Sequence, residues 1–179
     1  VVPGLIDLHT HVAHGATTPG VGMPCCDPDV IGVQSGVTTL VDCGSVGVAN
    51  LGVFPTHILP RASTRVIVLA NAACHAHTMP GMADMRSVED LDAEAMRRCV
   101  EHNPGLVQGI KLRLVGEVAA EHGEELVARS VEMAAEHGVP LMTHIGDFVR
   151  DDPEHRERMA GLTVSLLDRM RPGDILTHV

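Results

Sequence analysis

Two histidines, His9 and His11, lie two residues apart in an apolar stretch, at a spacing that could bind a metal ion. In an extended chain alternate side chains point to the same side, so Asp7, His9 and His11 share one face. Two imidazoles on one face of a strand can hold a single ion, and imidazole is a common zinc ligand. The pattern alone is weak in a chain with 12 histidines, and it recurs at His75 and His77. We expect that second pair to be solvated loop residues rather than ligands.

Three further residues with suitable chemistry lie in or at the end of other apolar stretches. Lys111 is the only lysine of the chain, and His144 and His178 each end a short apolar run. An ammonium group inside a strand is costly to bury, so we expect Lys111 to be neutralised, paired or modified. A neutral amine can take up carbon dioxide and form a carbamate, whose two oxygens can bridge two metal ions. The alternative is an ion pair with Asp7 or Asp42.

Six strands and five helices are predicted to position these residues. Alternation and β-branched residues predict strands at Leu5–Thr10, Val37–Asp42, Arg65–Ala70, Val107–Leu114, Pro140–Ile145 and Asp174–Val179. Helical periodicity predicts helices at Asp27–Ser35, Leu51–Leu59, Val88–His102, Glu121–His137 and about Met159–Met170. A capping box at Ser87–Asp90 and a helix stop at Gly138 mark two of the boundaries.

The strand starts are about 28 to 42 residues apart, which fits a repeated strand-helix unit with parallel strands. No G-x-G-x-x-G follows the first strand, which weakens a dinucleotide-binding fold. We therefore predict an α/β fold, a TIM-type (β/α)8 barrel of which about six units are present, since a complete barrel takes about 250 residues. Residues 1–179 are expected to form one partial barrel with strands 1–6, while strands 7–8 and any flanking β-sandwich lie outside this chain.

In such a barrel the carboxyl ends of the strands converge on one mouth, where catalytic residues gather. We predict that the metal-site residues meet at this mouth. Each histidine taken alone could instead be a hydrogen-bonded core residue. The residues concerned are His9, His11, Lys111, His144 and His178.

Composition excludes several other classes of protein. The chain has 179 residues, 45% of them hydrophobic, so it can form a core, and its net charge of −10 disfavours nucleic acid and anionic membranes as partners. Only 1% of the residues are aromatic, which leaves no surface for stacking bases. No segment reads as a signal peptide or a membrane span, and five cysteines without a C-x-x-C motif fit a reducing, cytoplasmic location.

Two sequence segments carry a resemblance to a known family. The first is Pro3-Gly4-Leu5-Ile6-Asp7-Leu8-His9-Thr10-His11, and the second is Gly36-Val37-Thr38-Thr39-Leu40-Val41-Asp42. Together they resemble the amidohydrolase superfamily of metal-dependent hydrolases, which includes dihydroorotases, hydantoinases and deacetylases. The surroundings of Asp42 and Lys111 look most like the deacetylase branch, which is related to dihydroorotase.

This resemblance implies a binuclear centre of two divalent ions, usually Zn²⁺, and hydrolysis of a carbon–nitrogen amide bond in a small molecule. His9 and His11 would hold one ion, His144 and His178 the other, and Lys111, carboxylated on its amine by carbon dioxide, would bridge them. A hydroxide between the two ions would attack the scissile carbonyl. The family's acid/base aspartate ends strand eight, beyond this chain, so the segment alone is expected to lack full activity.

Weaker predictions concern residues around the same mouth. Arg113, on the face of Lys111, could hold a substrate carboxylate or form an ordinary ion pair, Asn71 could line the substrate pocket, and Asp7 could orient a ligand imidazole. Other functions stay open: a cyclic amide hydrolase of the dihydroorotase or hydantoinase kind, or a scaffold barrel without activity. Association into a homo-oligomer is compatible with the acidic surface.

Overall fold

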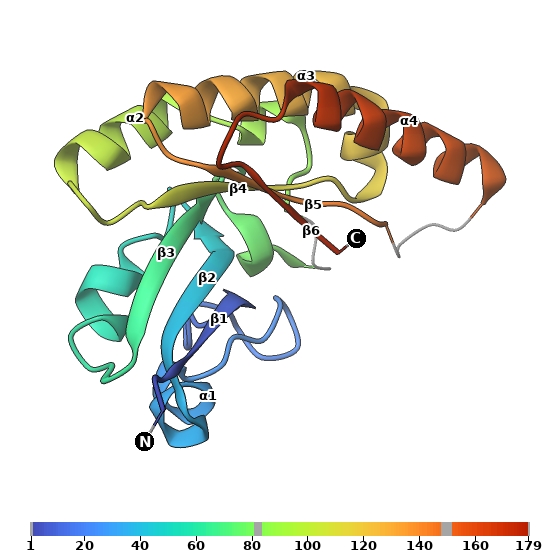
Figure 1. The fold of residues 1–179 in the computed structure, drawn as a ribbon. Helices are drawn as coiled ribbons and strands as arrows, with labels where there is room; N and C mark the ends of the chain where they lie inside the picture. The colour runs from blue at the N-terminus through green and yellow to red at the C-terminus, as the bar shows by residue number, and fades with distance from the viewer. Residues whose placement is uncertain (1, 81–83, 148–151, 179) are drawn as a thin grey trace.

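The computed structural model describes residues 2–80, 84–147 and 152–178, and its six strands form one parallel sheet (Figure 1). The strand order follows the chain order from β1 to β6. The strands are β1 (Leu5–Thr10), β2 (Val37–Gly47), β3 (Arg65–Asn71), β4 (Gly109–Arg113), β5 (Leu141–His144) and β6 (Ile175–Thr177). Sequential order with parallel pairing is the strand arrangement of a (β/α) barrel, so the structure contains part of a TIM-type barrel.

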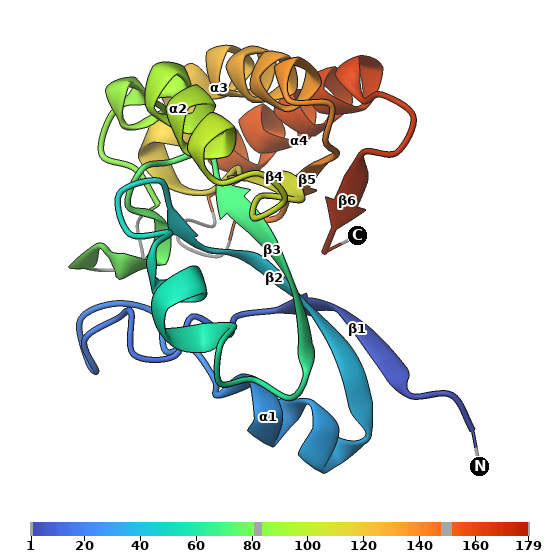
Figure 2. The same cartoon turned by 90° about the vertical axis from the view of Figure 1, so that its left-hand side faces the viewer.

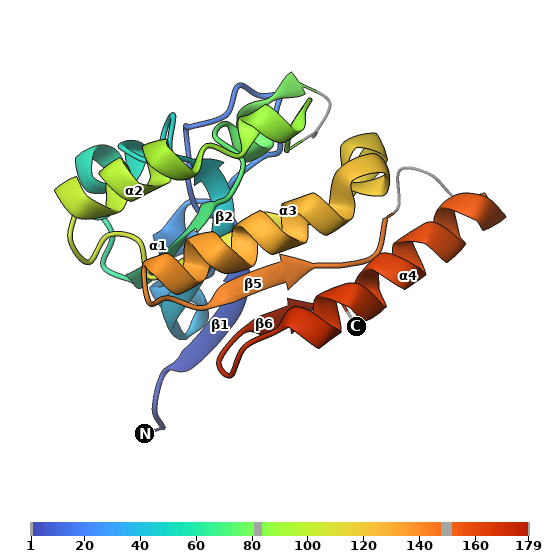
Figure 3. The ribbon, with the colours of Figure 1, turned by 90° about the horizontal axis from the view of Figure 1, so that it is seen from above.

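Helices connect consecutive strands, and the three longer ones cover β4–β6 on one side of the sheet (Figure 1). The α-helices are α1 (Pro28–Ile31), α2 (Ala93–His102), α3 (Gly116–Glu136) and α4 (Pro153–Arg169). Helical turns lie at Val33–Ser35, Phe54–Ile58, Ala76–Thr78 and Val88–Asp90. Seen from above, α3 and α4 run side by side (Figure 3), whereas α1 lies near the start of β2 (Figure 2).

Each predicted strand is present, although β2 extends five residues beyond its predicted end at Asp42, and the other differences concern the helices. Helix α4 begins six residues before the predicted position because Asp152 caps it, accepting a hydrogen bond from the His155 N–H at 2.9 Å, and Pro153 follows at its first position. Helix α3 begins at Gly116 rather than Glu121, since Gly116 N–H is held by Asp147. The predicted helix over Leu51–Leu59 is only a five-residue π-helical turn.

Two apolar clusters lie on opposite faces of the sheet. The larger one fills the space between strands and helices and includes Leu40, Ile110, Leu112 and Leu126, all 0% exposed. The smaller one lies on the concave face and consists of Val41, Cys43, Leu69 and Met142. Lys111 pairs in register with Met142, and Arg113 pairs with His144, so both basic side chains project from the concave face.

The sheet is curved enough to bring its two outer strands toward each other at their carboxyl ends. Among the described residues β1 and β6 do not pair, yet the rings of His9 and His178 are 4.8 Å apart. The predicted convergence of strand ends on one mouth is therefore present in the partial barrel. No helix of the described part of the chain is long and apolar enough to cross a membrane.

Candidate metal centre

Lys111 is the most deeply buried of the predicted site residues. Its side chain is 2% exposed, and its Nζ has no hydrogen-bond partner among the described residues. The alternative, an ion pair with Asp7 or Asp42, is therefore not present among the described residues, and the Asp42 carboxylate instead accepts hydrogen bonds from Ser45 and from the Val12 N–H. Burial lowers the pKa of Lys111 from 10.5 to about 8. The amine is thus a buried polar group whose missing hydrogen bonds destabilise the protein.

Space for the Lys111 side chain is created by a glycine at the turn of β2. Gly44 has a φ of +71°, and a Cβ added there would lie 2.6 Å from the Lys111 Cβ. Any residue with a side chain would be strained by the left-handed backbone at this position and would clash with Lys111. Gly44, whose position near a strand end suggests a place in the pocket lining, therefore maintains the lysine position.

The four predicted histidine ligands gather around Lys111 on one cavity of about 340 Å³. The His144 and His178 rings are 4.2 Å apart, and the His9 and His11 rings are 5.7 Å apart. His9 lies in β1 and His11 directly follows it, while His144 ends β5 and His178 directly follows β6. The structure thus brings together all five residues predicted from the strand ends.

A hydrogen-bond relay fixes the orientation of His11. The His11 Nδ1 lies 2.9 Å from the Ser45 hydroxyl, and that hydroxyl donates to the Asp42 carboxylate at 2.6 Å. Because the Ser45 proton is directed to Asp42, its oxygen is left to accept the N–H of His11 Nδ1. The lone pair of His11 then resides on Nε2, the other ring nitrogen. This arrangement is typical of metal-binding histidines.

The histidines are kept neutral by their surroundings. Burial lowers the pKa of His9 to about 4, with the Lys111 charge adding to the effect. Burial and the neighbouring His77 lower the pKa of His11 to about 2, while burial and Arg113 lower that of His144 to about 4. The pKa of His178 is lowered mainly by burial. Neutral imidazoles have the free lone pair that a metal requires.

One residue of the cavity was misjudged from the sequence. His77, expected to be a solvated loop residue, is 3% exposed, lines the cavity and has its ring 4.7 Å from that of His11. The expectation was wrong because His77 lies six residues beyond the end of β3, where strand geometry no longer sets side-chain direction. Ala76 takes a left-handed φ of +49°, and the helical turn Ala76–Thr78 buries the His77 side chain. His75 is exposed, as expected.

Asp84 connects the weaker candidates. Its buried carboxylate lies 3.2 Å from His77 Nε2, 3.3 Å from Arg113 Nη1 and 3.4 Å from Asn71 Nδ2. Burial acts to raise the pKa of Asp84, but these three contacts outweigh it and lower the pKa below its usual value. Arg113 lines the cavity while engaged in this ion pair, whereas Asn71, which also donates to the Gly44 carbonyl, is not on the cavity wall.

Asp7 has a different position from the predicted one. It is exposed, and its carboxylate accepts a hydrogen bond from the backbone N–H of His9 at 3.0 Å rather than from an imidazole. Among the described residues no three His, Cys, Asp or Glu side chains are already arranged around one point as a finished metal site. The imidazoles fit a divalent ion by chemistry, and the unpartnered Lys111 amine is the group that would complete their ligand set.

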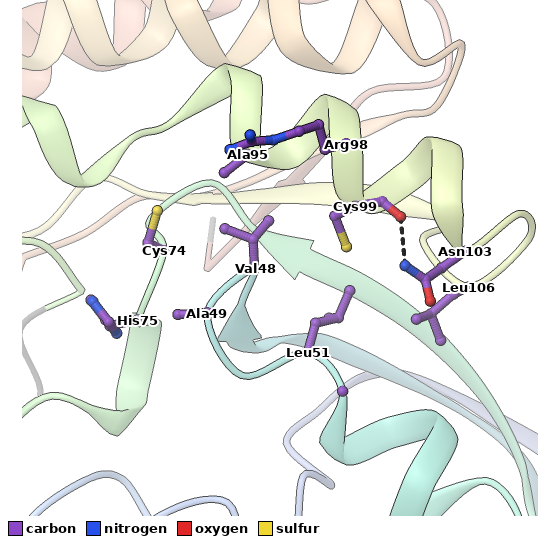
Figure 4. A pocket seen from close by; sticks show the side chains of 11 residues that line it. Val48, Ala49, Leu51, Cys74, His75, Ala95, Arg98, Cys99, Asn103 and Leu106 are labelled. Atoms are coloured by element: carbon purple, nitrogen blue, oxygen red, sulfur yellow. Dashed lines mark hydrogen bonds between the residues drawn. The ribbon is translucent and has the colours of Figure 1, made fainter.

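A second hollow, of about 550 Å³, lies outside the mouth, between the loops after β2 and β3 and helix α2 (Figure 4). Its floor is apolar, with Val48, Leu51 and Leu106. Its polar residues have contacts of their own: Asn103 donates to the Cys99 carbonyl at the end of α2, and Arg98 is 3.9 Å from Glu94. This hollow contains none of the predicted ligands.

Comparison with known proteins gave matches over nearly the whole chain. A protein of Brucella anthropi named deacetylase is 29% identical over 99% of this chain and 40% of its own length. A crystal structure of a dihydroorotase matches with a TM-score of 0.78 and 27% identity, covering 97% of this chain and 43% of that one. A crystal structure of an adenine deaminase matches with a TM-score of 0.73 and 27% identity, covering 97% and 42% of the two chains.

The chain spans about two fifths of the length of the relatives it matches. No family model matches it.

Proposed function

We propose that the chain belongs to the amidohydrolase superfamily and that the protein hydrolyses a carbon–nitrogen bond of a small-molecule amide with the help of two divalent metal ions. The observation that carries the proposal is the unpartnered, buried amine of Lys111 among four imidazoles of lowered pKa. A stable fold has no need for such a group, because leaving it unpaired costs about 1–3 kcal/mol or more.

In this proposal His9 and His11 hold one ion, and His144 and His178 hold the other. The Lys111 ammonium would first lose one proton, and the neutral amine would then add carbon dioxide, forming a new N–C bond and releasing a second proton, to give a carbamate anion that could bind both ions. Zn²⁺ suits the imidazole and carbamate donors best. Two such ions would polarise a carbonyl and supply hydroxide near neutral pH.

The chain's own residues have definable tasks in that reaction. The Ser45–Asp42 relay holds the His11 ring so that Nε2 faces the cavity. Arg113, held by Asp84, places a positive charge on the cavity wall, where it attracts the carbonyl oxygen or a carboxylate of the substrate. Proton delivery to the leaving amine is assigned to an aspartate that would end an eighth strand, outside these residues.

The first substrate class to test is N-acyl compounds, because the relatives matched by sequence are named deacetylases. The second is cyclic amides, because the dihydroorotase structure matches with the TM-score of 0.78. Turnover of N-acetyl compounds should exceed that of dihydroorotate and hydantoins. Turnover restricted to the cyclic set would reverse this assignment.

The decisive measurement is the metal content per chain by plasma emission, on protein purified without chelator. We expect about two ions, and for Lys111→Ala at most about one, with a loss of at least about 10³-fold in kcat/KM. Fewer than about 0.2 ions per chain after adding zinc and bicarbonate would instead support a scaffold barrel without catalysis.

A further inference from the structure

We propose that His77 is an additional ligand, through Nδ1, of the metal ion held by His9 and His11, with Asp84 as the carboxylate that orients it. This inference rests on the proposed metal centre and adds a ligand that no strand end supplies. It starts from the two buried polar side chains on the cavity wall that lack hydrogen-bond partners among the described residues, Lys111 at Nζ and His77 at both ring nitrogens. The metal-bridging carbamate accounts for the first only.

The second ring nitrogen of His77 also makes no hydrogen bond among the described residues, but it lies within ion-pair distance of a carboxylate. His77 Nε2 lies 3.2 Å from Asp84 Oδ1, and Asp84 is itself anchored by Arg113 and Asn71. A carboxylate beside Nε2 favours the tautomer that carries its proton there, which leaves the lone pair on Nδ1. Metal-binding histidines commonly donate the N–H of one ring nitrogen to a carboxylate and bind the ion with the other nitrogen.

His77 and His11 resemble each other in having a carboxylate near one ring nitrogen. The His11 ring has the Asp42 carboxylate behind it, through Ser45, and the His77 ring has Asp84. The two rings are 4.7 Å apart, closer than His11 is to His9 at 5.7 Å. The His11 ring therefore neighbours the rings of both His9 and His77, and in this inference all three bind one ion.

The backbone around His77 is built to keep the ring in place. The Met23 N–H donates to the His77 carbonyl at 3.1 Å, and a Cβ on Gly22 would lie 2.6 Å from that carbonyl oxygen. The left-handed Ala76 adds a strained residue immediately before His77. A purely structural histidine would explain the Asp84 contact, but it would leave Nδ1 buried and unsatisfied.

The chain supplies a matched control in the same tripeptide. His75 is exposed and faces the outer hollow rather than the mouth (Figure 4), so His75→Gln makes the same chemical change without touching the cavity. We would load metal-free protein, His77→Gln and His75→Gln with Co²⁺, record the visible absorption and measure affinity by chelator competition.

We expect His77→Gln to bind one of two ions at least about 100-fold more weakly and to change the cobalt absorption, with His75→Gln unchanged. Asp84→Asn should weaken the same ion by about 10- to 100-fold, because it removes the orienting carboxylate. A second measurement avoids variants that fail to fold: in ¹¹³Cd-loaded wild-type protein with ¹⁵N-labelled histidine, His77 Nδ1 should show a one-bond coupling to cadmium.

The outcomes separate this inference from the proposed function. If the wild type binds two ions while His77→Gln matches His75→Gln in affinity and absorption, His77 is no ligand and the proposed function stands. An effect of His77→Gln on KM alone would assign the ring to substrate instead and overturn the ligand role. If the wild type binds no ion, both proposals fail together.

Discussion

The middle and the edges of the sheet differ sharply in burial. Leu40 on β2 and Leu112 on β4 are 0% exposed, whereas Leu5, Ile6 and Leu8 on β1 are 63–65% exposed. At the other edge Ile175 on β6 is 41% exposed. The outer strands have a neighbour on one side only, so their apolar side chains stay accessible on this part of the chain.

The proposed metal centre is divided between these two environments. Lys111 lies on β4 in the closely packed middle of the sheet. His9 lies on the edge strand β1, and His178 directly follows the edge strand β6. We infer that the Lys111 side chain has a rigid position, whereas the positions of the His9 and His178 imidazoles depend on how firmly the edge strands β1 and β6 are packed. Substitutions in each region test this difference.

The largest expected effect is a contrast in stability between two leucines. Leu112→Ala should lower the free energy of unfolding by about 2–5 kcal/mol because it leaves a cavity in the middle of the core. Leu8→Ala should change it by less than about 0.5 kcal/mol, because Leu8 is already exposed. Urea unfolding measures both. A loss for Leu8→Ala as large as for Leu112→Ala would mean that another segment or a second copy covers β1.

The second prediction separates stability from function in the middle of the sheet. Lys111→Met should raise the free energy of unfolding of metal-free protein by about 3 kcal/mol at pH 7, because burial disfavours the charged amine whose pKa is lowered to about 8. Metal binding should be lost at the same time. Lys111→Gln, which keeps a buried polar group, serves as the control and should gain less. If Lys111→Met were less stable than the wild type, Lys111 would stabilise the fold. That result would contradict its assignment as a functional residue that lowers stability.

The third prediction concerns the glycine beside Lys111. Gly44→Ala should destabilise the protein by about 2 kcal/mol, from a left-handed backbone and contact with the Lys111 Cβ, and should reduce metal content. Gly36→Ala is the matched control, since its φ is +87° but a Cβ there meets nothing within 4 Å. That control should lose only about 1 kcal/mol and keep its metal. Equal metal loss in both variants would remove Gly44 from the site.

The last prediction concerns the pH dependence of the metal-free protein. His9 and His144 have pKa values of about 4 when folded and 6.5 when unfolded, so unfolding takes up protons between these values. The free energy of unfolding should therefore fall as the pH drops from about 6.5 to about 4, while these two histidines contribute no pH dependence above 6.5. The double variant His9→Asn, His144→Asn should flatten the slope in urea unfolding. An unchanged slope would show that both imidazoles are accessible to water.

Much of the fold was readable because the strands are short apolar runs at regular spacing. Every predicted strand is present within a few residues, and the strand-end rule placed His9, Lys111, His144 and His178 on one mouth. Helix starts were less predictable, since Asp147 holds Gly116 from another strand-helix unit. Long-range hydrogen bonds of this kind leave no local signal.

The sequence by itself determined the strand-helix repeat, the parallel barrel class and the ligand types, because side-chain periodicity and buried charge are local properties. Only the tertiary structure decided which polar groups end without partners. Whether a histidine is exposed to solvent or lines the candidate metal centre depends on carboxylates and backbone groups that are distant in the sequence. His75 and His77 have the same local pattern, and only the left-handed turn at Ala76 and the contact with Asp84 separate them.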